Sequence, residues 1–183
     1  MRIGVPKEIK PQENRIGLTP ESVKVLTSNG HEVLIESNGG YEAGFDNEQY
    51  KKSGAKIVNK AEDIFNDSEI IVKVKEPLTN EIKMIRENQI VFTYLHLAAG
   101  KQLTEGLVKS KSVCIAYETI TDNNGRLPLL APMSAVAGRM SVQAGAHCLE
   151  KNQNGRGVLL GGAPGVEPAT VVILGGGVVG ENA

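Results

Sequence analysis

Short runs rich in valine and isoleucine alternate with helical patterns along the chain. The runs are almost continuously apolar, which is typical of parallel strands that are buried on both faces. A strand followed by a helix and then by another strand indicates a parallel crossover connection rather than a hairpin. The sequence therefore predicts an α/β fold, an open parallel sheet of flavodoxin or Rossmann type with helices on both faces. The expected strands are residues 2–6, 31–37, 55–58, 69–77, 89–97 and 112–119.

Helical patterns lie between these strands. The first begins at Thr19 and Pro20, because threonine can cap the first free amides and proline suits the first helical position. Gly30 supplies an end for this helix, since glycine adopts the left-handed conformation at little cost. Four further helices are expected at residues 47–54, 60–66, 79–88 and 101–110.

Residues 129–151 interrupt this alternation. Pro132 can open a helix that runs to about Lys151, with apolar residues at helical spacing. Two interpretations remain open: a linker helix that packs against a second domain or another subunit, and a plain buried helix. The predicted organisation is a first domain at 1–128, this helix at 129–151, and the start of a second domain at 152–183, whose first strand is 169–177.

The balance of charges and the apolar pattern exclude several classes of protein. The formal net charge is −1 and lysines are interspersed with acidic residues, so no basic patch indicates nucleic-acid binding. No signal peptide and no bilayer-spanning run is present, so we expect a cytoplasmic protein with no membrane part. Cys114 and Cys148 lack CxxC spacing and the histidines lack neighbouring ligands, so we expect buried, reduced thiols and no metal site.

Three polar residues follow predicted strands at the edge where open parallel sheets bind ligands. Arg15 lies in a long charged loop after the first strand, Lys75 ends the fourth, and His96 leaves the fifth. Arginine offers a planar fork for a carboxylate, and lysine can hold a carbonyl oxygen or a carboxylate. Histidine is suited to proton transfer near neutral pH. Together these side chains suit a small 2-oxo or 2-amino acid.

Each of these residues also has a plainer interpretation. A loop arginine is usually a solvated charge, and a lysine at a strand end often serves only to discourage aggregation. An exposed imidazole at the end of a strand has no packing reason to be there, which favours a function for His96. Of the other histidines, His31 is expected to face solvent, and His147 to lie in a core or an interface.

A glycine-rich turn follows the last predicted strand. Gly175, Gly177 and Gly180 form G-x-G-x-x-G, with Val178 and Val179 between the last two glycines. Alone this motif is weak, but directly after a strand it indicates a turn that approaches the pyrophosphate of NAD. The following helix has only three residues here, and the acidic residue expected about 20 positions later would lie beyond the end. We therefore expect an incomplete cofactor site and a truncated chain.

Several stretches of the chain resemble the L-alanine dehydrogenase family, and the resemblance extends over all 183 residues. It implies reversible, NAD-dependent oxidative deamination of L-alanine to pyruvate and ammonia, and it matches the first half of that family's chain. The stretches are MRIGVPKEIKPQENRIGLTPESV, VKVKEP, HLAA, AYET, LAPMSAVAGRMSVQAGAHCLE and GVLLGGAPGVEPATVVILGGGVVGENA.

The resemblance also implies roles for individual residues. Arg15 would hold the substrate carboxylate, Lys75 would contact the carboxylate or carbonyl side, and His96 would act as acid and base. Ser134 would lie on the cofactor. The family usually forms hexamers, so a homo-oligomer is expected, and a dimer is open for this chain.

Two related families and one non-enzymatic function are the alternatives. The NAD-binding subunit of proton-translocating transhydrogenase has Asn-Ala-Pro in place of Lys75, Glu76 and Pro77, and it lacks the histidine of HLAA, so it resembles this chain less. Saccharopine-type dehydrogenases are more distant. Because the expected cofactor site is incomplete, we expect this chain alone to be inactive, and a non-catalytic substrate-binding fragment remains open.

Overall fold

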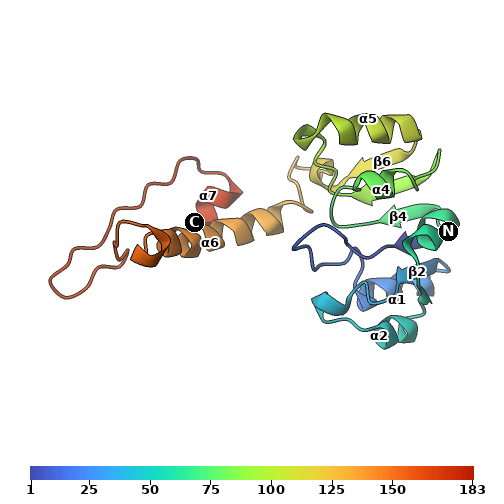
Figure 1. Cartoon of the computed structure of the whole chain (residues 1–183), viewed down its shortest axis with the longest axis horizontal. Coiled ribbons are helices and arrows are strands. Elements are labelled where there is room, and N and C mark those ends of the chain that lie inside the picture. The colour runs from blue at the N-terminus through green and yellow to red at the C-terminus, as the bar shows by residue number, and fades with distance from the viewer. The chain divides into compact units, whose positions relative to one another are not determined.

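The computed structural model describes residues 1–183 and divides into two compact units, Met1–Glu118 and Thr119–Ala183. In Figure 1 the first unit runs from blue to yellow and the second runs through orange to red. The division falls ten residues before the domain boundary expected at 128.

The first unit is built on a six-stranded, entirely parallel sheet, as the sequence predicts. The strand order is β3-β2-β1-β4-β5-β6, so the direction of winding reverses between β1 and β4. In open α/β sheets this reversal creates a crevice outside the carboxyl ends of the strands. The strands are β1 (Arg2–Val5), β2 (Glu32–Glu36), β3 (Lys56–Val58), β4 (Ile70–Val72), β5 (Ile90–Thr93) and β6 (Val113–Ala116).

Helices cover both faces of this sheet because alternate strand residues point to opposite sides. Val33 and Ile35 of β2 belong to a core with Val23 and Tyr50, whereas Leu34 belongs to a second core with α3 and α5. The helices are α1 (Pro20–Ser28), α2 (Asn47–Lys52), α3 (Ala61–Asp67), α4 (Thr79–Ile82) and α5 (Lys101–Ser110) (Figure 1). Single 3₁₀ turns lie at η1 (Tyr41–Ala43), η2 (Leu97–Ala99) and η3 (Tyr117–Thr119).

Local sequence signals explain how these helices begin and end. Thr19 caps α1 by accepting the amide of Ser22, and Pro20 occupies the first turn, as expected. Gly30 follows α1 with a φ of 80°, the left-handed region that favours glycine. Asp46 forms a capping box with Gln49 at the start of α2. Only α4 is clearly shorter than its pattern, since it ends at Ile82 rather than near residue 88.

The fourth strand is also shorter than expected, ending at Val72 rather than continuing to residue 77. Beyond Val72 the chain still pairs with its β5 neighbour, since the amide of Lys73 donates to Phe92 O at 3.1 Å. The next two amides, of Val74 and Lys75, donate instead to the carboxylate of Glu8. A side chain therefore replaces the backbone partner that would have extended the strand.

The second unit consists of α6 (Ala131–Cys148), a 3₁₀ turn η4 (Lys151–Gln153), a long loop and α7 (Val178–Asn182). Most of α6 is exposed, and Gly138 is its buried residue, because α7 packs closely there. His147 is exposed and its Nδ1 lies 3.4 Å from Glu150 Oε1, so it does not lie in a core of this chain; the interface position stays a prediction. No helix of the structure is both long and apolar enough to cross a bilayer.

The strand expected at residues 169–177 is wrong for this structure. Residues 169–176 form neither strand nor helix, and Val172 and Leu174 are exposed. A strand is defined by backbone hydrogen bonds to a neighbour, and this segment has no strand beside it to pair with. The apolar pattern is present, but the sheet that would accept it is not.

Candidate functional site

Three ionisable residues follow three adjacent strands of the first unit. Arg15 lies in the loop between β1 and α1, Lys75 lies three residues after β4, and His96 lies three residues after β5. The strands β1, β4 and β5 are neighbours in the sheet. Because all strands are parallel, the three loops leave the same edge, next to the reversal in strand order.

Arg15 is paired with a carboxylate of its own loop. Its Nε donates to Glu13 Oε1 at 2.8 Å and its Nη2 donates to Glu13 Oε2 at 2.6 Å. The hydrogen bond from Arg15 lowers the pKa of Glu13, and the charge of Lys75 lowers it further. Glu13 is therefore paired with Arg15 in the bidentate geometry with which guanidinium groups bind carboxylates.

A buried ion cluster comes directly before Lys75. The Lys73 side chain is fully buried, and its Nζ donates to Glu81 Oε1 at 2.6 Å and to Glu8 Oε2 at 3.2 Å. The other oxygen of Glu8 accepts the backbone amides of Val74 at 2.6 Å and Lys75 at 3.2 Å. The backbone of Lys75 is thus tied to a buried carboxylate from the loop after β1.

This cluster was not expected from the sequence. Alternation along a strand would put Lys73 on the same side as Lys75, but Lys73 is completely buried and Lys75 is half-buried. Its partner Glu8 lies 65 positions away in the chain. No local spacing could have indicated that contact.

His96 stands at a turn held by Glu118. Its backbone is left-handed, with φ 51° and ψ 38°, and its side chain is exposed. Glu118 Oε1 accepts the amide of His96 at 2.8 Å and that of Leu95 at 3.0 Å. Glu118 is part of the AYET stretch that carried the family resemblance, but nothing in the sequence pointed to this contact.

Three aromatic side chains contact one another near the carboxyl ends of β5 and β6. Tyr117 makes edge-to-face contacts with Phe92 and Tyr94, at centroid distances of 4.3 and 4.8 Å. Burial raises the pKa of Tyr94, and the positive charge of Arg15 opposes this effect. In the strand expected at 89–97 Tyr94 would share a side with His96, but β5 ends at Thr93 and His96 is left-handed, so alternation does not relate the two side chains.

Glu76 directly follows Lys75 in the chain and carries a paired carboxylate. Its Oε1 is ion-paired with Lys10 Nζ, and its Oε2 is buried without a hydrogen-bond partner. Burial opposes ionisation, but the hydrogen bond from Lys10, with the electrostatic influence of Lys10 and His96, leaves the pKa of Glu76 below its ordinary value. Glu76 therefore carries a negative charge at neutral pH.

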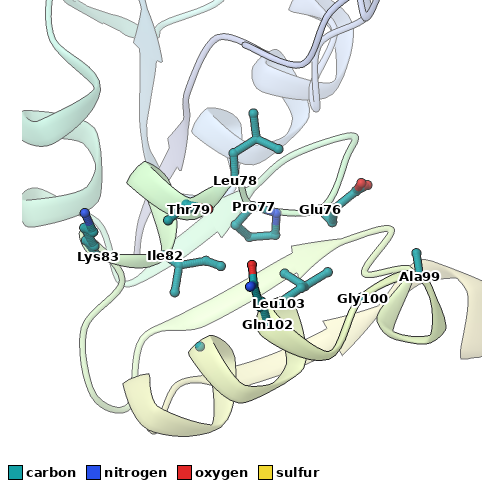
Figure 2. Close-up of a pocket in the computed structure, with 11 residues that line it drawn as sticks. Glu76, Pro77, Leu78, Thr79, Ile82, Lys83, Ala99, Gly100, Gln102 and Leu103 are labelled. Carbon is teal, nitrogen blue, oxygen red and sulfur yellow. The ribbon is translucent and has the colours of Figure 1, made fainter.

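A separate hollow of about 410 Å³ lies between α4 and α5. Figure 2 shows Pro77 and Ile82 on one side of this hollow and Leu103 of α5 on the other. Arg15, Lys75 and His96 do not line it. The hollow is therefore separate from the three candidate residues.

The cofactor candidates lie together in the second unit. Gly175 has a φ of 107°, and a Cβ on Gly180 would overlap the carbonyl oxygen of Gly175. Glycine is thus required at both positions, as in a turn that brings its backbone close to a pyrophosphate. One hollow of about 580 Å³ is lined by Ser134, Gly175, Gly177, Val178, Val179 and Gly180, among other residues.

Neither the cysteines nor the other potential ligands form a metal site. Cys114 is half-buried and Cys148 is exposed, so the expectation of two buried thiols is wrong for Cys148; both are unpaired. No group of three or more histidine, cysteine, aspartate or glutamate side chains is arranged so that it could hold a metal ion.

Comparison with known proteins gives consistent similarities over the whole chain. The family profile "Alanine dehydrogenase/PNT, N-terminal domain" matches residues 4–137, and the corresponding C-terminal domain profile matches residues 141–183. Alanine dehydrogenase from Halomonas elongata is 54% identical over 183 residues, which are 100% of this chain and 49% of the relative. The chain therefore spans about half the length of the curated relatives it matches.

Two solved structures share the fold. An L-alanine dehydrogenase superposes with a TM-score of 0.89 at 55% identity, over 100% of this chain and 50% of its own. The transhydrogenase from Sinorhizobium meliloti superposes with a TM-score of 0.72 at 22% identity, over 82% of this chain and 45% of its own. At that low identity the second likeness concerns the fold alone.

Proposed function

This chain belongs to the alanine dehydrogenase/PNT family, and we propose that it forms the substrate-binding half of an NAD-dependent L-alanine dehydrogenase. Such an enzyme interconverts L-alanine with pyruvate and ammonia. The observation that supports the proposal most strongly is the placement of Arg15, Lys75 and His96 after three adjacent parallel strands. A fork for a carboxylate, a cation and a proton-transfer group at one sheet edge are what a small 2-oxo acid requires.

Each of the three side chains has a different role toward the substrate. Arg15 binds the substrate carboxylate through its planar guanidinium, and Glu13 holds that group in a bidentate orientation. Lys75 donates to the carbonyl oxygen of pyruvate, and its positive charge stabilises the negative charge that develops there. After alanine has lost a hydride to the cofactor and a proton from its amino group, water adds to the imino carbon. His96 accepts a proton from the oxygen of that water and returns it as ammonia leaves and pyruvate forms.

The glycine turn and Ser134 would hold the cofactor. NAD supplies a hydride acceptor when it is bound. Gly175 and Gly180 allow the backbone to approach a pyrophosphate, and Ser134 lies on the same hollow. The residues of this chain contribute binding and orientation at that end of the cofactor.

We propose that the protein is a cytoplasmic homo-oligomer. The unpaired cysteines support a reducing compartment, where thiols are kept free. The exposed apolar side chains of Val136 and Met140 on α6 support an interface between copies of the chain. Sedimentation velocity on the purified chain would measure its oligomeric state. A monomer at all concentrations would contradict the proposed homo-oligomer.

Pyruvate binding by the 183-residue chain tests the proposed function. We expect calorimetric titration to detect pyruvate, and Arg15→Ala and Lys75→Ala each to weaken binding at least tenfold, since a hydrogen bond to a charged group contributes about 1.5–3 kcal/mol. Lys109→Ala on the exposed side of α5 is the matched control and should leave the affinity unchanged. Equal affinities in all four proteins, or no binding by the wild type, would refute the proposal.

A further inference from the structure

The carboxylate of Glu118 accepts hydrogen bonds from the backbone at His96. One oxygen accepts the amide of His96 at 2.8 Å and that of Leu95 at 3.0 Å, and the other accepts Leu95 at 3.2 Å. Glu118 follows β6, the edge strand that pairs with β5. A side chain therefore connects the ends of β5 and β6 beyond the backbone hydrogen bonds that pair the two strands.

His96 adopts a conformation that needs such support. Its φ of 51° lies in the left-handed region, which non-glycine residues occupy mainly where the surroundings hold them. The turn is closed on its other side, where the amide of Ala99 donates to His96 O at 2.8 Å. The imidazole is exposed, so the direction in which it projects depends on the backbone that carries it.

We propose that Glu118 is a positioning residue for His96. Its carboxylate fixes two consecutive amides and thereby holds the left-handed turn that directs the imidazole toward the substrate edge. Hydrogen bonds from backbone amides to a carboxylate are stronger than bonds between neutral groups. Because Glu118 contacts the backbone and not the ring, it takes no part in proton transfer. The inference rests on the proposed function, in which His96 exchanges a proton at the substrate.

The first experiment measures the turn directly and needs no ligand. In the isotope-labelled chain, Glu118→Ala should speed hydrogen exchange at the amides of Leu95 and His96 by about ten- to a hundredfold, the range expected for losing a hydrogen bond to a charged group. The His96 ring signals should shift, while those of His147, in the other unit, should not. Glu118→Gln keeps one acceptor oxygen and should restore part of the protection.

The control variant is Glu105→Ala. Glu105 is a half-exposed glutamate on α5 whose carboxylate lies 3.5 Å from Lys101 Nζ, so its removal deletes a similar charge away from the turn. It should leave the exchange rates of both amides unchanged. Unchanged rates in Glu118→Ala as well would overturn the proposal.

The second experiment separates positioning from a general effect on the fold. Glu118→Ala should weaken pyruvate binding by no more than His96→Ala does, and it should have no further effect in a His96→Ala background, because it acts through His96. An equal loss in both backgrounds would mean that Glu118 acts elsewhere, which would refute the proposal. If the wild-type chain binds no pyruvate, the proposed function fails, while the exchange experiment still decides the role of Glu118.

Discussion

Removing the buried ammonium of Lys73 should destabilise the first unit more than removing any exposed charge. The Lys73 side chain has no solvent exposure, and its carboxylate partners Glu8 and Glu81 are only 2% and 3% exposed. Lys73→Met fills a similar volume but leaves two carboxylates buried without their cation. Breaking a buried ion pair by removing one partner costs about 3–5 kcal/mol, a large part of the 5–15 kcal/mol that stabilises a typical domain.

The assay is urea unfolding followed by far-ultraviolet circular dichroism, since the chain has no tryptophan to report by fluorescence. Lys101→Met is the control, because Lys101 is 87% exposed and lies 3.5 Å from Glu105, so its loss should cost about 0–1 kcal/mol. The Lys73→Met variant should also loosen the backbone of Lys75, which shares the carboxylate of Glu8.

A second substitution tests whether uncompensated charge is the cause. Glu81→Gln, added to Lys73→Met, removes one of the two charges and keeps an oxygen that can accept the amide of Leu78. The double variant should recover about 1–3 kcal/mol relative to Lys73→Met. The reasoning is wrong if Lys73→Met unfolds at the same urea concentration as the wild type, or if the double variant is less stable than Lys73→Met.

Other changes have clear expected outcomes. Burial raises the pKa of Tyr50 to about 12, so the neutral phenol contributes fully to stability below its ordinary pKa of 10, and this contribution is lost as the pH rises toward 12. Tyr50→Phe should lower the free energy of unfolding by about 1 kcal/mol at neutral pH, because the hydrogen bond to Leu18 O is lost. Unfolding titrations at alkaline pH should show the stability difference between variant and wild type becoming smaller. The pKa of Glu13 is lowered by Arg15, so Glu13→Gln should be less stable than wild type at neutral pH, and acid titration should show the difference disappearing as pH falls below 4.5. Gly138→Ala would place its Cβ against the Val179 carbonyl and should expose α7 to hydrogen exchange, whereas Gly145→Ala, where a Cβ meets nothing, should not; equal exchange in both would contradict the packing described here.

Local patterns in the sequence were enough to predict the sheet and its covering helices. Alternating apolar runs and helical spacing specify which segments are strands or helices, and Thr19 and Pro20 specify the start of α1. The placement of Arg15, Lys75 and His96 after three strands also follows from the sequence once the sheet is known to be parallel. The roles of these residues remain predictions that the binding experiments address.

Element boundaries were less predictable where side chains compete with the backbone. The apolar pattern of residues 69–77 continues past Val72, but Glu8 takes the next two free amides and the strand ends. The pattern of residues 169–174 is equally suited to a strand, yet no neighbouring strand is present to pair with it. A strand depends on its partner, so its own sequence cannot determine whether it forms.

The α/β class, the parallel sheet, the main helices and the family can be predicted from the amino-acid sequence, because each depends on residues close together in the chain. The burial of Lys73 between Glu8 and Glu81, and the hold of Glu118 on the backbone of His96, become visible only in the folded chain. These contacts join residues 8 to 65 positions apart in the chain. Their geometry exists only after the strands have paired, because pairing is what brings the ends of β1, β4, β5 and β6 to one edge.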